Sequence, residues 1–238
     1  VQLALDAETR VLVVQAERET PMLLLRPLTT LLREGTEEGK DAVVLTLHLL
    51  ADELGSAIVQ SDGVPPLVAL LRNGTERQKF FAVSTLVRCH MRMAEVDDEA
   101  ALDAVVGTIQ NEIANTNAIA PLSALLHASS DGTQALAARA LAIFLPGNDA
   151  LVRAAAAAGA VAPLVASLRD GTEGQKTNAP MALFALALNF EVGETIAAAG
   201  AIPLLIDLVR DGTEAQMAHA TAALVPLAQN ARNADTIK

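Results

Sequence analysis

One segment of this chain recurs several times with small changes. "GVPPLVALLRNGTERQK" from Gly63 aligns with "GAVAPLVASLRDGTEGQK" from Gly159 and with "GAIPLLIDLVRDGTEAQM" from Gly200. A unit of this length cannot bury its own apolar face, so neighbouring units must stack on one another to form a continuous core. One proline marks each of five units, with spacings of 39, 55, 42 and 40 residues: Pro27, Pro66, Pro121, Pro163 and Pro203.

Each unit carries the signals of three helices. A glycine or asparagine suited to the left-handed conformation ends the first helix, and a proline in the first turn begins the second. A Gly-Thr pair then breaks the chain, and the threonine caps a longer third helix together with a glutamine three residues later. We expect the left-handed positions at Gly63, Asn117, Gly159 and Gly200, and the capping boxes at Thr75–Gln78, Thr172–Gln175 and Thr213–Gln216.

The third unit departs from this pattern at its loop. "DGTQ" at Asp131 resembles the loop but lies three residues late relative to Pro121. Aligning the third and fourth units without gaps, at an offset of 42 residues, keeps their apolar positions in step. In this register Ser129 takes the place of the loop glycine Gly171, and the local Gly-Thr pair is a partial coincidence.

The arrangement resembles the armadillo-repeat family, in the variety whose second and third helices are joined by "GT-E-x-Q-K". The resemblance covers about Pro21 to Lys238. It implies an all-α fold, a right-handed superhelix of stacked three-helix repeats with the third helices lining a concave face. Residues 1–238 are then a single solenoid. We expect a partial repeat at 1–18, repeats at about 20–53, 54–93, 104–146, 147–190 and 191–230, the start of a further repeat at 231–238, and an acidic insertion at about 91–106.

The composition supports helices and limits the classes of partner. The chain is 52% apolar but has no Trp or Tyr, and its Ala, Leu and Val suit close-packed helices. A formal charge of −11 argues against a nucleic-acid binder, which needs clustered Lys and Arg. The longest charge-free run, 154–168, is shorter than a membrane-spanning helix needs, so we expect no membrane insertion.

The single cysteine, Cys89, excludes an internal disulfide, and no secretory signal is recognisable. We therefore expect an intracellular protein, cytoplasmic in the first instance. An organelle stays open, because the chain begins at Val1 rather than Met and ends in mid-pattern at Lys238. For the same reason we expect the chain to be part of a longer protein.

No arrangement of residues indicates catalysis, a cofactor or a metal site. The repeated loop lacks the Gly-Lys-Ser/Thr motif, and a glutamate follows its threonine, which favours the helix dipole but would repel phosphate. The four histidines share no metal-ligand spacing. Cys89 and His90 are adjacent, so on a helix they point about 100° apart. We predict that the chain is not an enzyme.

The third helices also lack the residues by which armadillo receptors hold extended peptides. The family resemblance places an Asn fourteen residues after each loop glycine and a Trp one turn earlier. The Asn positions hold Leu49, Arg88, Ile143, Ala185 and Pro226. The Trp positions hold Leu45, Ser84, Arg139, Met181 and Ala222. A peptide receptor of the nuclear-import type would therefore lack its binding residues.

Other residues of the third helices are candidates for partner contacts. Phe80 and Phe81 are adjacent, so one can pack inward while Phe81 anchors a partner; the alternative is that both are core or inter-repeat contacts. Pro180 and Pro226 lie inside third helices and are expected to kink them. The candidates for polar contacts are Arg88, Arg139, Asn178 and His219.

An acidic segment lengthens the spacing between the second and third units. It contains "EVDDEAALD" and lacks the glycine and spacing of a calcium loop. It is either a solvated loop that runs into a lengthened first helix, or a docking element for a basic partner. Its candidate residues are Glu95, Asp97, Asp98 and Glu99.

These observations predict a non-catalytic scaffold or adaptor that binds other proteins through its curved helical surface, as a subunit of a larger assembly. The alternative is a regulatory armadillo domain of a longer multidomain protein, such as a ubiquitin ligase. A peptide receptor of the nuclear-import type is less favoured, because both side-chain ladders are absent.

Overall fold

The chain folds entirely into helices wherever its structure is described. The computed structural model describes residues 7–20, 22–94 and 99–229. Within these ranges there are 14 α-helices, one 3-10 turn and no strand. The helices form two compact units, Val1–Ala118 (unit 1) and Ile119–Lys238 (unit 2). The predicted all-α class is therefore confirmed.

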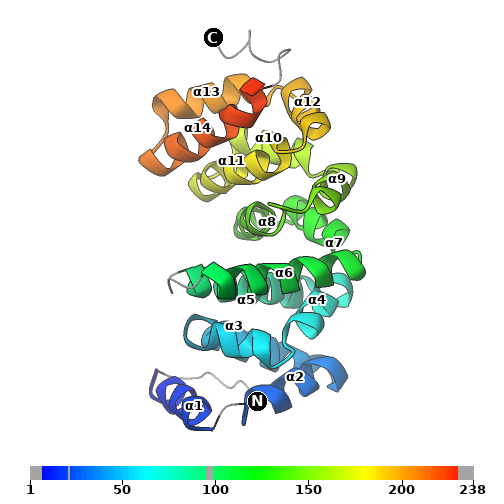
Figure 1. Ribbon diagram of the computed structural model, residues 1–238, viewed down its shortest axis with the longest axis vertical. Coiled ribbons are helices and arrows are strands. Elements are labelled where there is room, and N and C mark those ends of the chain that lie inside the picture. Colours follow the sequence, from blue (N-terminus) through cyan, green and yellow to red (C-terminus); the bar gives the residue numbers. More distant parts are fainter. Residues whose placement is uncertain (1–6, 21, 95–98, 230–238) are drawn as a thin grey trace. The chain divides into compact units, whose positions relative to one another are not determined.

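Unit 1 is built on two long helices that pack against each other. Its described helices are α1 (Ala7–Glu19), α2 (Leu25–Glu34), α3 (Glu37–Gln60), α4 (Val64–Asn73), α5 (Glu76–Ala94) and α6 (Glu99–Asn115). The long helices are α3 and α5, with α2 packed on α3 and α4 packed on α5 (Figure 1). Leu47, Leu50 and Leu86 are buried in this core. Since α1 meets α3 at Val14, the core continues to the first described helix.

Helix α3 bends where its backbone leaves the helical conformation. Leu54 has φ −118° and ψ 19°, which divides α3 into two parts. The next residue, Gly55, lies so close to α5 that a Cβ there would sit 3.0 Å from the Cα of Cys89. The break falls where the predicted repeat 20–53 ends, although the repeat boundaries themselves stay a prediction.

Unit 2 places one helix between two similar neighbours. Its elements are α7 (Ile119–Ala124), the 3-10 turn η1 (Leu125–His127), α8 (Asp131–Phe144), α9 (Asp149–Ala157), α10 (Val161–Asp170), α11 (Glu173–Ala187), α12 (Phe190–Ala198), α13 (Ala201–Asp211) and α14 (Glu214–Gln229). Helix α11 packs against both α8 and α14. Helix α11 buries Ala179, Ala182 and Leu183 completely. The two alanines are small, so they let the neighbouring helices approach closely.

The helix starts confirm the predicted capping chemistry. The Thr172 backbone N–H donates to Gln175 Oε1 at 2.7 Å, and the Thr172 side chain accepts from the Gln175 backbone N–H. The same reciprocal bonds join Thr75 to Gln78 and Thr213 to Gln216. In the third unit, Ser130 caps α8 by accepting from the Thr133 backbone N–H. The ungapped register, with Ser129 in the loop-glycine place, is therefore confirmed.

Three of the four predicted left-handed residues are confirmed, and one is wrong. Gly159, Gly200 and Asn117 have φ values of 83°, 81° and 54°. Gly63 instead has φ −78°, and Asp62 before it takes the left-handed conformation at φ 61°. Aspartate tolerates that conformation because its short polar side chain bonds locally. Gly63 is needed for space, since a Cβ there would lie 2.6 Å from the Ile58 carbonyl oxygen.

The two internal prolines do not end their helices. Helix α11 runs through Pro180, and α14 runs through Pro226. Each proline removes one backbone hydrogen bond from its helix. The bend that we expect at each site stays a prediction.

Helix α3 corrects the expectation that no segment is long enough to span a membrane. Among the described residues, α3 has 24 residues and is apolar enough to cross one by length and composition alone. The bent pairs α9–α10 and α12–α13 pass the same test if each pair is one span. A search for charge-free runs misses α3, because Asp52 and Glu53 interrupt its apolar stretch. Much of its apolar side-chain surface, Val44 and Leu47 included, is buried in unit 1.

Candidate binding face

The third helix of each repeat has one side that the core does not use. We define the third-helix face as the residues 7, 10, 14 and 17 positions after each loop residue, because steps of three and four keep side chains on one side of a helix. In unit 1 these are Ala42, Leu45, Leu49 and Asp52 on α3, and Phe81, Ser84, Arg88 and Met91 on α5. In unit 2 these are Leu136, Arg139, Ile143 and Pro146 on or just after α8, Asn178, Met181, Ala185 and Leu188 on or just after α11, and His219, Ala222, Pro226 and Gln229 on α14. All except Ser84 and Ala185 are at least partly exposed.

In unit 1 the charged residues of this face pair with each other. Arg88 Nη1 on α5 forms an ion pair with Asp52 Oδ2 on α3. Both side chains stay largely in solvent, so the pair links the two helices but leaves little net charge for a partner. Contact of Arg88 with a partner stays a prediction, and within the chain its side chain is paired with Asp52.

Phe81, the predicted anchor, is partly exposed and contacts side chains of its own unit. Its ring centroid lies 5.2 Å from that of His48 on α3 and 5.3 Å from that of Phe80. The Arg77 guanidinium carbon lies 5.7 Å from the Phe81 centroid, within the range of a cation–π contact. These contacts favour the inter-repeat alternative for Phe81.

His48 adds no charge to this face near neutral pH. Burial lowers the pKa of its imidazole, and the neighbouring Arg88 charge lowers it further. Its Nδ1 is buried and has no hydrogen-bond partner among the described residues. The α3–α5 face is therefore a neutral, internally paired surface.

In unit 2 three predicted contact residues lie on the faces of neighbouring helices. Arg139 on α8 and Asn178 on α11 have no side-chain ion pair or hydrogen bond among the described residues. His219 on α14 is held, since its Nδ1 lies 3.0 Å from the Thr177 carbonyl oxygen on α11. Leu188, at the end of α11, is 54% exposed. It lies in the turn that joins α11 to α12, one residue after the last residue of α11.

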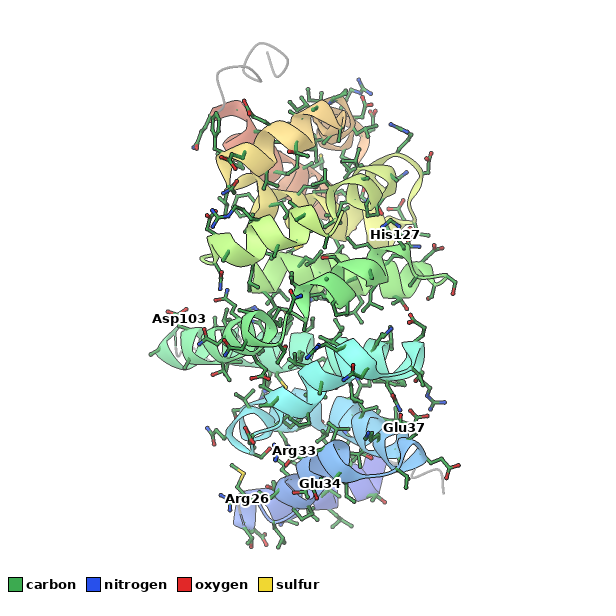
Figure 2. All side chains as sticks on the ribbon, turned by 90° about the vertical axis from the view of Figure 1, so that its right-hand side faces the viewer. Arg26, Arg33, Glu34, Glu37, Asp103 and His127 are labelled. Atoms are coloured by element: carbon green, nitrogen blue, oxygen red, sulfur yellow. The ribbon has the colours of Figure 1, made fainter. Side chains whose placement is uncertain are left out.

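The acidic segment is only partly described. Glu95, Asp97 and Asp98 lie outside the described residues, as does the side chain of Glu99, where α6 begins. Helix α6 has 17 residues, against nine in α9 and in α12, so the predicted lengthened first helix is confirmed. Asp103 is exposed on α6, as Figure 2 shows. Docking of a basic partner here stays a prediction.

The capping glutamines have a second role that the sequence reasoning missed. Gln78 Nε2 donates to the carbonyl oxygen and to Oε2 of Glu37, at 3.4 and 3.3 Å. Gln216 Nε2 donates to Oε2 of Glu173 at 2.8 Å, and Gln175 Nε2 to Oε1 of Gln134 at 2.6 Å. Each buried glutamine thus caps its own helix and bonds to the start of the preceding third helix. The "T-E-x-Q" at Thr75, Thr172 and Thr213 held part of this signal, since it repeats a carboxylate and an amide at the same two positions in three of the five loops.

This network also affects one carboxylate. The Lys40 ammonium, and after it the Gln78 amide, lower the pKa of Glu37 by hydrogen bonding. Glu37 therefore stays ionised, as its positions at the helix N-terminus and next to Gln78 require.

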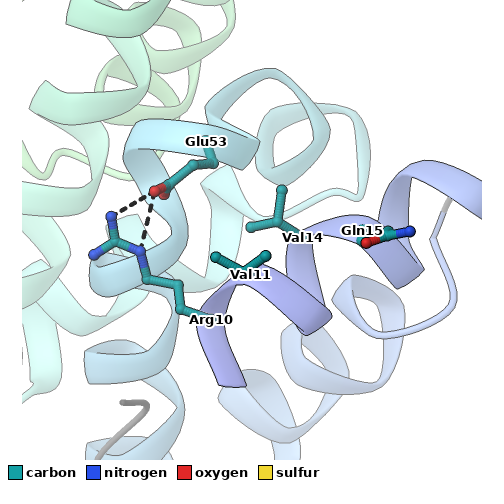
Figure 3. Close-up of a pocket in the computed structure, with 5 residues that line it drawn as sticks. All are labelled: Arg10, Val11, Val14, Gln15 and Glu53. Atoms are coloured by element: carbon teal, nitrogen blue, oxygen red, sulfur yellow. Dashed lines mark hydrogen bonds and ion pairs between the residues drawn. The ribbon is translucent and has the colours of Figure 1, made fainter. Parts of the chain in front are cut away.

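Three crevices lie away from the third-helix faces. In unit 1, a space of about 310 Å³ is lined by Arg10, Val11, Val14, Gln15 and Glu53, where Arg10 Nε donates to Glu53 Oε1 at 3.0 Å (Figure 3). In unit 2, spaces of about 590 and 410 Å³ lie beside Gln134 and Gln216 along the loop edge. Among the described residues, no group of three His, Cys, Asp or Glu is placed to hold a metal ion.

Comparison with solved structures identifies the fold. A designed armadillo repeat protein in complex with the peptide (KR)4 is 27% identical, with a TM-score of 0.66, over 90% of this chain and 85% of that one. A second designed armadillo repeat protein is 24% identical, with a TM-score of 0.56, over 85% of this chain and 99% of that one. A structure from work on the interaction between cadherin and beta-catenin is 16% identical, with a TM-score of 0.74, over 95% of this chain and 42% of that one.

No protein-family model matches the chain, and no curated protein sequence matches it. The structural likeness therefore carries the assignment. This chain has the armadillo-repeat fold, the class of stacked three-helix repeats that the sequence predicted.

Proposed function

We propose that this chain is a non-catalytic scaffold that binds other proteins through its third-helix faces, as an adaptor or subunit of a larger assembly. The observation that carries the proposal is the side of α11 that faces neither α8 nor α14. Leu188 is 54% exposed and Met181 is partly exposed there, while Ala182 and Leu183 on the same helix are fully buried. Leu136 and Ile143 on α8 add two more partly exposed apolar side chains to the same face, and exposed apolar side chains that share one face favour a protein-binding surface.

The structural neighbours support this use of the fold. One of them is in complex with a peptide, and another comes from work on a protein–protein interaction. This chain differs from a receptor for extended peptides in the side chains that it presents, because its Asn and Trp positions hold other residues. We therefore propose that the third-helix faces bind partners by contacts other than the Asn and Trp ladders that hold extended peptides.

The chemistry of Cys89 supports a non-catalytic role. Its side chain is fully buried, and burial raises the pKa of the thiol to about 12. A cysteine nucleophile needs an exposed thiolate, so Cys89 is suited to packing rather than to attack on a substrate.

The proposal can be tested with charges placed on the face and away from it. Met181→Glu with Leu188→Glu puts two carboxylates on the α11 face. Ala157→Glu with Ala198→Glu puts two on exposed positions of α9 and α12 as a matched control. Each variant is expressed in the native source, and the proteins bound to it are recovered and quantified, with circular dichroism to confirm folding.

We expect the face variant to lose partners that the control variant retains. Equal recovery by the unmodified chain and both variants would contradict the proposal, because binding would then not involve this face.

A further inference from the structure

The third-helix face of unit 2 carries one arginine and no Lys, Asp or Glu. This residue is Arg139 on α8. Arg139 is partly buried and has no ion pair or hydrogen bond among the described residues. A partner that covers this face would remove water from a guanidinium, which is unfavourable unless the partner supplies a carboxylate.

The same face offers few groups that could bond to a peptide backbone. The Thr177 hydroxyl already donates to the Glu173 carbonyl oxygen, and the Thr221 hydroxyl donates to that of Met217. His219 Nδ1 is engaged with the Thr177 carbonyl oxygen. The polar groups of the face that remain available are Arg139, Asn178, Nε2 of His219 and, at the end of α14, Gln229.

An extended peptide on this surface would leave most of its backbone groups without partners. Each buried, unpaired backbone group is strongly unfavourable. An α-helix pairs its backbone groups internally and needs only an apolar side to lie on the face. Ile143, Met181 and Leu188 are partly or largely exposed and offer the unbranched and branched apolar side chains that such a helix would contact.

We propose that the unit-2 face binds an amphipathic helix of a partner protein, which lays its apolar side on Met181 and Leu188 and places one carboxylate against Arg139. This inference rests on the proposed function and specifies the partner's chemistry. It excludes a basic extended peptide as the occupant, since Arg139 would repel it and the backbone would stay unpaired.

An unbiased peptide selection tests the inference. Displayed random peptides of about 16 residues, long enough for several helical turns, are selected on the full chain. The same library is selected on Arg139→Glu and on Arg169→Glu, a charge reversal at an exposed position of α10 outside the face. We expect the unmodified chain to enrich peptides with apolar residues at i, i+3, i+4 and i+7 and one Asp or Glu. Arg139→Glu should enrich Lys or Arg at that position, and Arg169→Glu should select as the unmodified chain does.

A synthetic copy of the most enriched peptide then gives affinities. Arg139→Glu should weaken its binding about tenfold or more, because attraction becomes repulsion. Arg169→Glu should leave the affinity unchanged, and a proline in the middle of the peptide should abolish binding.

The failures can be told apart. Enrichment of basic peptides with an alternating, extended pattern would overturn the inference, and so would peptides that Arg139→Glu binds equally well. If such peptides still lose binding to Met181→Glu with Leu188→Glu, the proposed function stands. If no peptide is enriched on any form of the chain, the inference is contradicted, and the recovery of partner proteins by Met181→Glu with Leu188→Glu decides separately whether the proposed function stands.

Discussion

The third-helix faces of the two units occupy equivalent positions in the repeat, but their side chains make different contacts. On α3 and α5 the charges of Asp52 and Arg88 pair, and Phe81 contacts His48, Phe80 and Arg77. On α8 and α11, Arg139 and Asn178 have no partner among the described residues, and Leu188 is exposed. Equivalent positions in a repeat protein can therefore join repeats in one unit and remain available for a partner in another.

Substitution of the capping glutamines, which both units share, should have the largest effect on the free energy of unfolding. Gln175→Ala removes the acceptor of the Thr172 backbone N–H and the bond to Gln134. We expect a loss of about 2 kcal/mol in the free energy of unfolding, measured by urea unfolding. Gln78→Ala in unit 1 should be similar, because Gln78 makes the same reciprocal capping bonds with Thr75 and also bonds to the start of the preceding third helix. The control Gln229→Ala, at an exposed position, should stay within about 0.5 kcal/mol.

If Gln78→Ala and Gln175→Ala lower the free energy of unfolding by very different amounts, the two units are not stabilised in the same way. Differences between their faces could then not be assigned to the face residues.

The close contact between α3 and α5 at Gly55 should give the next largest change in the free energy of unfolding. Gly55→Ala places a Cβ 3.0 Å from the Cα of Cys89, so α5 must move away from α3. We expect a net loss of about 1 kcal/mol, since overpacking outweighs the gain in helix propensity. Gly107→Ala on α6 is the matched control: a Cβ there meets nothing within 4 Å, so the substitution should be neutral or stabilising. Equal gains from both substitutions would contradict the tight α3–α5 contact.

The two arginines test the difference between the faces directly. Arg88→Ala removes the ion pair with Asp52 and should lower the free energy of unfolding by up to about 1 kcal/mol. Arg139→Ala should change it by less than about 0.5 kcal/mol, because no interaction within the described residues is lost. The reverse order in urea unfolding would show that Arg139, not Arg88, is the structural residue.

The smallest effect concerns His48 and pH. Its pKa is lowered in the folded chain, so the folded state binds fewer protons than the unfolded state below the ordinary value of 6.5. The stability that His48 contributes is therefore present above that value and is lost as the pH falls below it. Unfolding measured at pH 7 and pH 5 should show a smaller loss for His48→Gln than for the unmodified chain. An equal loss in both would contradict the burial of a neutral imidazole at the unit-1 face.

The capping bonds could be predicted from the sequence, because they join residues that are close together in the chain. Thr172 and Gln175 are three residues apart, and their reciprocal bonds depend only on that spacing. Even the irregular third loop, with Ser130 as the cap, follows from keeping the apolar positions in step. The exception is Asp62, which takes the left-handed place predicted for Gly63, because either residue tolerates that conformation and the path of the chain decides between them.

The use of the faces could not be predicted in the same way. Arg88 and Arg139 look alike in the sequence, and both lie at ladder positions on third helices. Only the structure shows that Asp52, which precedes Arg88 by 36 residues, reaches across to pair with it. Pairings between repeats depend on side-chain reach across the stack, which a pattern within one repeat does not contain.

The central claim that follows from comparing the two faces is that an amphipathic helix binds the face of unit 2 rather than that of unit 1. Methionine methyl groups report on both, since Met181 lies on α11 and Met91 on α5. The most direct measurement is an NMR spectrum of the methyl-labelled chain, with each signal assigned by substitution to Leu, before and after addition of the selected helical peptide. We predict that the Met181 signal shifts while the Met91 signal does not. A shift of Met91 with Met181 unchanged would contradict the account.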